Sequence, residues 1–300
     1  MKLKISCPGK IILMGEHAVV YGRPAIVAAV NRRMTMNYES RIKNKQSFST
    51  NNEEVSTTKI ISRIPIGCGM GSSAALSVIL AASHMVLSGM TELTSAILSK
   101  INQIAHENEK IYHTNPSGVD PTICTYGGIL WYQKLKSGTK LFKKLEIKHL
   151  PKFILINTGK PEETTGEMVQ MVSGKLKKEK NRTNRIFDVI EEQTKLFLKA
   201  LTERMAKEKR VSLIKNCIQN CESCLEDLGI VGQKAKEIVR EIEENGGVAK
   251  VSGGGGTKKG SGILLCFHEN PEEIIKIAKK NRLDYYQVKL GVKGLTVNYQ

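Results

Sequence analysis

The segment IPIGCGMGSSAAL, residues 64–76, constrains this chain more than any other, because three glycines alternate with larger residues just before a run of small ones. Glycine in an ordered segment costs conformational entropy, so this density indicates a neighbour that lies too close to the backbone to admit side chains. The small residues from Ser72 onward predict a helix over residues 72–87. The glycines therefore lead into a helix N-terminus, where free amide groups and the helix dipole attract an anion.

A polyphosphate is the anion that this glycine segment predicts, because a backbone without side chains can wrap closely around phosphate oxygens. The segment is not a Walker motif, since no lysine follows the last glycine, and its spacing differs from the dinucleotide fingerprint. The structural alternative is a tight loop packed on a sheet, in which glycine serves only the backbone conformation.

Other short motifs supply the residue types that phosphoryl transfer requires. PGK and GEH bracket a predicted strand and place Lys10, Glu16 and His17 near its two ends, while NPSGVD ends in Asp120, eleven residues after Glu109. A kinase needs oxygen ligands for Mg²⁺, a cation for the developing charge, and an acid to orient the attacking alcohol. Each residue alone also has an ordinary reading as a surface lysine, a solvated helix end or a helix cap.

The stretches PGKIILMGEHAVVYG, PIGCGMGSSAA and NPSGVD, in this order, resemble the GHMP kinase superfamily and, within it, the mevalonate kinases. The stretch GEHAVVYG differs from galactokinases, and NPSGVD favours mevalonate kinases over phosphomevalonate kinases. The resemblance implies an α+β fold of two domains. Residues 1–150 would form an ATP-binding α/β domain like one found in ribosomal proteins, and residues 151–300 a ferredoxin-like domain.

The resemblance also implies roles for individual residues. Ser73 and Glu109 match the Mg²⁺ ligands of the family. Asp120 matches the acid proposed to accept the proton of the mevalonate 5-hydroxyl group, and Lys10 the lysine near that hydroxyl and the γ-phosphate. The positions that match the ATP phosphate loop are Gly67, Cys68, Gly69, Met70, Gly71, Ser72 and Ser73.

The substrate side of the site is expected to include Glu16, His17 and Thr158, again by resemblance. His17 is a candidate partner for the substrate carboxylate. The third glycine motif, Ser252–Gly262, departs from the family pattern G-A-G-G-G-G-C, because it reads SGGGGTKKGSG and carries Thr257, Lys258 and Lys259. Since this motif normally supports the phosphate loop, we consider its two extra lysines as groups that favour a triphosphate.

The activity that follows from the resemblance is ATP-dependent phosphorylation of mevalonate at its 5-hydroxyl group, which yields 5-phosphomevalonate and ADP. The near alternatives are phosphomevalonate kinase and mevalonate 3-kinase, and the distant one is a non-catalytic protein that binds nucleotides or RNA on the same fold. The expected partners are mevalonate, ATP and Mg²⁺, without nucleic acid or a membrane, and a homodimer is one option for assembly.

The composition is compatible with this interpretation. A net charge of +17 fits nucleic-acid binding, attraction of small anions, or simply a lysine-rich proteome. The densest basic run, residues 175–185, lacks interleaved aromatic residues and is read as a solvated helix face or loop. The seven cysteines and the absence of a secretory pattern at the start predict free thiols in the cytoplasm.

Periodicity predicts the remaining elements. Residues 74–90 are read as a buried helix because they are short for a membrane span, and Cys217, Cys221 and Cys224 as a buried helix face, with metal binding as the alternative. Residues 42–58 are expected to form a hairpin or loop, and residues 157–169 a threonine-rich loop. Strands are predicted over residues 2–6, 11–14, 25–30 and 34–38, and further helices over residues 91–110, 184–206, 211–227 and 231–244.

Overall fold

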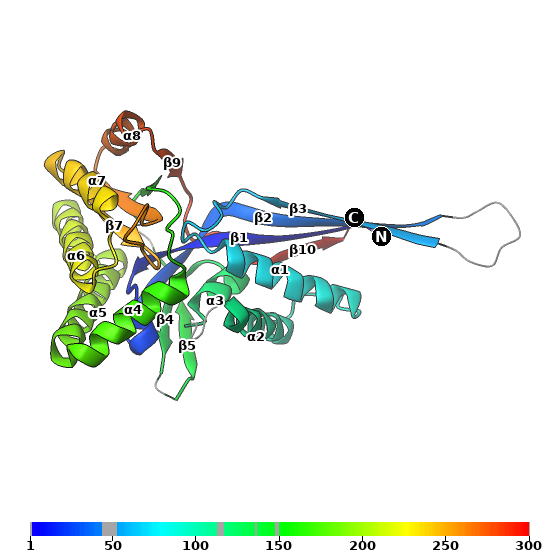
Figure 1. Ribbon diagram of the computed structural model, residues 1–300. Coiled ribbons are helices and arrows are strands. Elements are labelled where there is room, and N and C mark those ends of the chain that lie inside the picture. The colour runs from blue at the N-terminus through cyan, green and yellow to red at the C-terminus, as the bar shows by residue number, and fades with distance from the viewer. Residues whose placement is uncertain (1, 44–52, 113–116, 136, 148–149, 300) are drawn as a thin grey trace, which may run out of the picture.

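The computed structural model describes residues 2–43, 53–112, 117–135, 137–147 and 150–299, which form two β-sheets surrounded by helices (Figure 1). The first sheet has the order β10-β1-β2-β4-β5, with β3 paired to β2. Helices α1 and α3 pack against this sheet, and α2 packs against α1 and α3. The bounds of these helices are α1 Ser72–Leu87, α2 Ser95–Tyr112 and α3 Val119–Tyr126. The strands of the sheet are β1 Lys2–Met14, β2 Ala25–Lys43, β3 Glu53–Ser62, β4 Ile129–Lys134, β5 Lys140–Lys144 and β10 Thr296–Tyr299.

The second sheet has four antiparallel strands in the order β7-β8-β6-β9. Along the chain, β6 is followed by helices, then β7, β8, a further helix and β9, which is the split β-α-β arrangement of ferredoxin-like domains. The predicted mixed fold with two sheets is thus confirmed. The bounds are β6 Ile154–Asn157, α4 Thr165–Lys178, α5 Lys180–Thr202, α6 Lys207–Leu228, α7 Gln233–Glu244, β7 Val248–Ser252, β8 Ile263–Phe267, α8 Pro271–Lys280 and β9 Asp284–Gln287.

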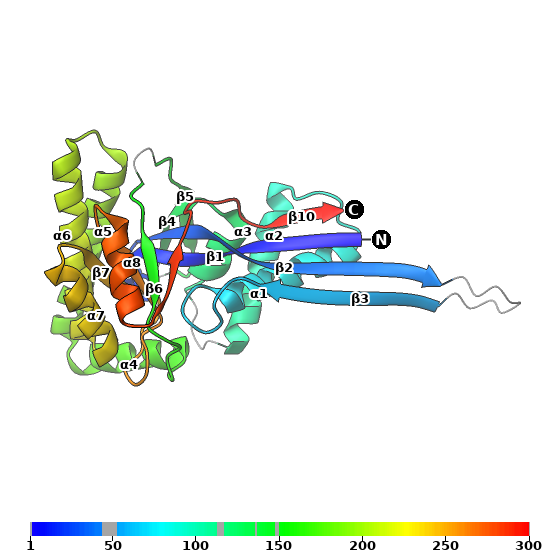
Figure 2. The same ribbon diagram turned by 90° about the horizontal axis from the view of Figure 1, so that it is seen from above.

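The last strand does not belong to the second sheet. β10 returns to the first sheet and pairs antiparallel with β1, so that Leu3 lies opposite Tyr299 (Figure 2). The two chain ends therefore lie side by side. The expected division at residue 150 does not account for this return.

Strands β1 and β2 are longer than predicted, because residues expected to interrupt them remain within the strand. β1 runs through the PGK motif, where the pairing with β2 shifts register between Pro8 and Gly9, so the expected division into strands 2–6 and 11–14 is wrong. A Cβ at Gly9 would lie 2.9 Å from the Met70 carbonyl oxygen, and glycine therefore lets the glycine-rich segment approach β1. β2 likewise runs unbroken over residues 25–43.

The expected hairpin or loop over residues 42–58 includes the end of β2 and the start of β3, and residues 44–52 lie outside the described part of the chain. Helix α1 has the predicted bounds, and α5, α6 and α7 lie near the predicted positions. Helix α4 is the missed element, since part of a predicted loop is helical. Its N-terminus is a capping box, in which Thr164 and Glu167 bond to each other's backbone amide groups.

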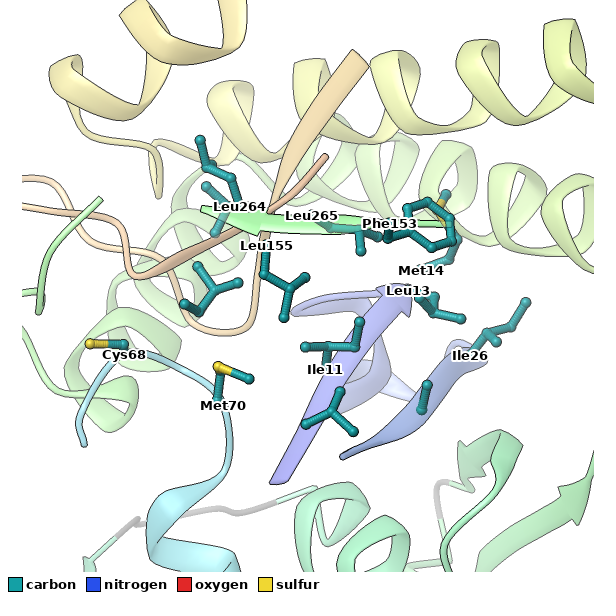
Figure 3. Packing of buried hydrophobic residues seen from close by; sticks show 14 of the residues in the cluster. Ile11, Leu13, Met14, Ile26, Cys68, Met70, Phe153, Leu155, Leu264 and Leu265 are labelled. Carbon is teal, nitrogen blue, oxygen red and sulfur yellow. The ribbon is translucent and has the colours of Figure 1, made fainter. Parts of the chain in front are cut away.

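A single buried cluster joins both sheets (Figure 3). It unites Ile11 of β1, Met70 of the glycine-rich segment and Leu155 of β6, and the side chain of Leu155 points toward β1 in the figure. The glycine-rich segment is therefore fastened between the two halves of the molecule.

Two further expectations are confirmed. Helix α1 buries most of its apolar residues, and no helix in the described part of the chain is long and apolar enough to cross a bilayer. Cys217, Cys221 and Cys224 are buried free thiols on α6. No group of three or more His, Cys, Asp or Glu side chains in the described ranges is placed to hold a metal ion.

Candidate active site

A cavity of about 540 Å³ lies between the first sheet's helices and the second half of the molecule. Four segments supply most of its wall. They are the phosphate loop (residues 67–73), the start of α3, the acidic loop (residues 160–166, which leads into α4) and residues Gly253–Gly255 of the third glycine loop (Ser252–Gly262). Lys10 of β1 and Glu109 of α2 also line the cavity.

The phosphate loop alternates between the cavity and the core. Gly67, Gly69 and Gly71 line the cavity, whereas the side chains of Cys68 and Met70 are buried in the hydrophobic cluster. The predicted nucleotide contacts of Cys68 and Met70 are therefore restricted to their backbone amides, since the Met70 carbonyl already accepts from the Lys10 amide. This alternation explains the period of the glycine pattern.

Both readings of the glycines have support in the geometry. All three have positive φ, at +74°, +87° and +75°, so the backbone conformation alone favours glycine. A Cβ on Gly71 would also lie 2.7 Å from Lys10 Cγ. At the same time Gly71 is the N-cap of α1, and Ser72 and Ser73 line the cavity at the helix N-terminus, where an anion is favoured.

Lys10 and Asp120 form an ion pair in the cavity wall, with 3.1 Å between Nζ and Oδ2. Lys10 follows the irregular step in β1, and Asp120 lies in the first turn of α3. The lysine side chain is 4 % exposed and the aspartate side chain 32 %. The aspartate therefore presents a carboxylate to the cavity, and the lysine holds that carboxylate from behind.

Glu109 is buried beside this pair. Burial and the charge of Asp120 raise the pKa of Glu109 to about 8, while Lys10 and Lys140 oppose the rise. The carboxyl groups of Glu109 and Asp120 thus lie close together with little positive charge between them, and a bound cation would favour the ionised form of both. Mg²⁺ is typically held by one or two carboxylates together with substrate phosphates, so Glu109 and the Ser73 hydroxyl, both in the cavity wall, fit this ion.

His17 lines the cavity, as expected, and its ring is buried. Its Nε2 donates to the Gly254 carbonyl oxygen at 3.0 Å, and burial lowers its pKa to about 4. The ring is therefore neutral near pH 7, and its Nδ1 has no hydrogen-bond partner among the described residues. Among the described residues that line the cavity, Lys10 and Lys160 are the lysines that could pair with a carboxylate.

Glu16 and Thr158 lie outside the cavity wall, unlike the expectation. Glu16 is fully buried and ion-paired with Lys250 of β7. Thr158 is also buried, because its hydroxyl donates to the Gly262 carbonyl and accepts from the Ser261 amide. The resemblance led to the correct segment, but the cavity begins two residues later, at Lys160.

Two of the extra residues of the third glycine loop, Thr257 and Lys259, contact the acidic loop. Lys259 pairs with Glu162 at 2.9 Å, and the Thr257 amide and hydroxyl donate to Glu163. Glu162 and Glu163 belong to the acidic loop and line the cavity. The inserted residues thus link two parts of the wall, a role that the interpretation of the lysines as phosphate ligands missed.

Comparison with known proteins agrees with this geometry. The family "GHMP kinases N terminal domain" matches residues 35–128. The chain is 30% identical to a mevalonate kinase of Thermococcus sibiricus, with 93% of this chain and 94% of that protein covered. It is 28% identical to a mevalonate kinase of Pyrococcus furiosus, over 93% and 92% of the two chains.

Among solved structures, the fold is similar to that of L. major mevalonate kinase in complex with R-mevalonate, with a TM-score of 0.76. The superposition covers 97% of this chain and 96% of that one at 20% identity, which supports the two-sheet fold itself. With the sequence similarity extending over nearly the whole length, the chain belongs to the mevalonate kinase family of GHMP kinases.

Proposed function

We propose that this protein transfers the γ-phosphoryl group of ATP to the 5-hydroxyl group of mevalonate, which yields 5-phosphomevalonate and ADP. Relatives named mevalonate kinase, similar over nearly the whole chain, support the choice of substrate. The observation that carries the proposal is the Lys10–Asp120 pair, which lies in one cavity with the phosphate loop.

In this reaction the alcohol oxygen forms a bond to the γ-phosphorus while the bond to the β–γ bridging oxygen breaks. The hydroxyl proton passes to the Asp120 carboxylate. Phosphoryl transfer has a loose transition state, so catalysis rests mainly on positioning and on stabilisation of charge. Asp120 orients the hydroxyl group, and the Lys10 ammonium stabilises the charge that develops between the reactants.

The phosphate loop would bind the ATP phosphates through its amide groups at the N-terminus of α1. Ser73 and Glu109 would hold Mg²⁺, which when bound neutralises charge on the phosphate oxygens. Lys160, the other lysine of the cavity wall, lies against the phosphate loop, because a Cβ on Gly67 would lie 2.8 Å from the Lys160 Cε. We therefore place Lys160 with the phosphates rather than with the alcohol.

An assay of ADP release with a panel of alcohols tests the function. The panel includes mevalonate, 5-phosphomevalonate and galactose, and ³¹P NMR of the product identifies the phosphorylated hydroxyl group. We expect release with mevalonate and a product phosphorylated at carbon 5. A product phosphorylated at carbon 3, or a preference for 5-phosphomevalonate, would assign the protein to another reaction, and ATP binding without release for any alcohol would mean a non-catalytic protein.

A further inference from the structure

Glu16 and Lys250 form an ion pair with no exposure to solvent, although they are 234 positions apart in the sequence. Glu16 follows β1, and Lys250 lies in β7, so the pair joins the first half of the molecule to the second. Lys250 also donates to the Val251 carbonyl oxygen at 3.1 Å. A buried ion pair is weak evidence for stability, because the cost of removing two charges from water offsets their attraction.

Neither residue lines the cavity, but each is next to residues that do. His17 follows Glu16 directly, and Gly253–Gly255 follow Lys250 after two residues. The two segments are also joined by the bond from His17 to the Gly254 carbonyl, and by Ser252, whose hydroxyl bonds to the amide and carbonyl of Ile12 at 2.9 and 3.0 Å. The ion pair is thus one of several contacts that join these two segments behind one side of the cavity, and it is the one between charged groups.

The backbone at His17 needs such support. Its φ is +55°, in the left-handed region that a residue with a side chain seldom adopts. Strained conformations of this kind persist only where the surroundings hold them. Glu16 is the neighbouring residue, and its side chain is bound at its carboxylate end by Lys250.

We propose that Lys250 is a positioning residue for phosphoryl transfer: its ammonium group anchors Glu16 and thereby holds His17 and Gly253–Gly255 in the cavity wall. The inference rests on the proposed mevalonate kinase activity for its kinetic readout. It assigns Glu16 to the support of the site, where the resemblance implied a contact with substrate. The phosphate loop has its own attachment, from the Lys10 amide to the Met70 carbonyl, so the effect should fall mainly on the alcohol substrate.

The experiment compares Lys250→Met, Glu16→Gln and the double variant Glu16→Gln/Lys250→Met. Lys250→Met leaves the Glu16 carboxylate without its donor, and Glu16→Gln leaves the buried Lys250 ammonium group without its counter-charge, so we expect each to lower Tm. In the double variant both charges are gone, and most of the lost Tm should return. If the pair positions the wall, the KM for mevalonate in the double variant stays at least about tenfold above that of the wild type, which corresponds to 1.4 kcal/mol. The KM for ATP should change less than about threefold, or 0.7 kcal/mol.

Glu222→Gln is the matched control. Glu222 is buried in the same region and accepts from the Val251 amide at 2.8 Å, a bond that glutamine can keep. It should retain the wild-type KM for both substrates. A double variant that recovers both Tm and the KM for mevalonate would reduce the pair to a structural role and overturn the proposal, as would a normal KM in Lys250→Met.

A second measurement keeps the inference independent of the assay. Amide hydrogen exchange of residues 15–18 and 253–255 should be faster in Lys250→Met than in Glu222→Gln, and Lys250→Gln replaces Lys250→Met if the latter does not fold. Equal exchange in the two proteins would also overturn the proposal. If the wild type does not phosphorylate mevalonate, the proposed function fails, while the exchange comparison still decides whether Lys250 holds this wall.

Discussion

At the residue scale, the site depends on a few side chains whose charge is set by burial. Lys10 is nearly inaccessible while its partner Asp120 faces the cavity, and Glu109 lies buried behind them. This arrangement gives three acidic and basic groups different tasks, although they lie within one small volume. Substitutions that remove charge and keep size can separate those tasks.

Asp120→Asn keeps the shape of the side chain and removes the carboxylate to which we assign the hydroxyl proton. We expect kcat to fall by at least ~10² with Kd for ATP near its wild-type value, since proton acceptors of this kind contribute about that much. Steady-state kinetics and an ATP titration provide the measurement. Asp188→Asn, on the exposed face of α5, is the control and should keep its activity. Wild-type kcat in Asp120→Asn would remove this residue from the reaction.

Glu109→Gln replaces the carboxylate assigned to Mg²⁺ with a neutral amide, which is a weaker ligand for this ion. The Mg²⁺ concentration for half-maximal rate should rise by at least about tenfold, or 1.4 kcal/mol. Glu107 lies on the same helix and pairs with Lys110 at the surface, so Glu107→Gln serves as the control. An unchanged Mg²⁺ dependence in an active Glu109→Gln protein would contradict the assignment.

The buried carboxyl group of Glu222 makes the free energy of unfolding depend on pH. Burial raises the pKa of Glu222 from its ordinary 4.5 to about 8, the charges of Glu226 and Glu16 add to the rise, and the Val251 amide and Lys250 oppose it. The folded state therefore holds a proton that the unfolded chain loses, so the free energy of unfolding falls as pH rises from 4.5 toward 8. In Glu222→Gln, the decrease in Tm between pH 6 and pH 9 should be smaller by roughly 2–5 °C. Equal slopes in differential scanning calorimetry would contradict this.

Sequence motifs predicted residues that line the cavity but not the contacts behind it. Lys10, Asp120 and the phosphate loop could be found because each lies in a short motif of defined composition, and Glu109 because it precedes Asp120 by eleven residues. Lys250 could not, because its partner is distant in sequence and the pairing exists only after both halves have packed together. Thr158 was misplaced for a related reason, since a motif gives the segment and the local turn decides which side chain faces the cavity.

At the scale of secondary structure, helices were easier to predict than strands. The bounds of α1 follow from its small apolar residues and its glycine start, and the capping box Thr164–Glu167 was a local pattern for α4 that could have been recognised. The continuity of β1 through Pro8 and Gly9 depends on pairing with β2, a contact between distant residues that local propensity does not encode.

Gly71→Ala tests the link between the start of α1 and ATP. Alanine at φ +75° is strained and would meet the Lys10 side chain, so Tm of the free protein should fall. The Kd for ATP should rise by about tenfold, or 1.4 kcal/mol, because the Cβ would displace the Lys10 side chain beside the N-terminus of α1. Gly89→Ala, at the other end of the helix, is the matched control, since Gly89 has φ +96° and no atom within 4 Å of the added Cβ. It should lower Tm without changing ATP affinity. Normal ATP affinity in folded Gly71→Ala would leave these glycines with a purely structural role.

At the scale of the whole molecule, the two sheets share one buried cluster and the final strand returns to the first sheet. The two halves are therefore expected to unfold together. Each half contributes one side of the cavity, so relative movement of the halves would separate the phosphate loop from the third glycine loop. This explains why links such as His17–Gly254 and Ser252–Ile12 join distant parts of the chain.

Truncation after Leu295 removes β10 and leaves the edge of β1 unpaired. We expect a lower Tm and concentration-dependent association, because an exposed strand edge pairs with other chains. Light scattering and thermal unfolding measure the two effects. Asn298→Ala keeps the strand and alters only an exposed side chain, and it should behave as the wild type. A truncated protein with wild-type Tm and no association would show that β10 contributes nothing to the first sheet.

The position of β10 also sets an order of events during translation. β1 leaves the ribosome early, but its partner at this edge, β10, lies beyond the whole second sheet in the sequence. The nascent first half must therefore wait with one edge open while the second half is translated and folded. Slow codons between β1 and β10 would lengthen that exposure, and a holdase that covers extended apolar strands would be most useful to this protein in the interval before β10 emerges.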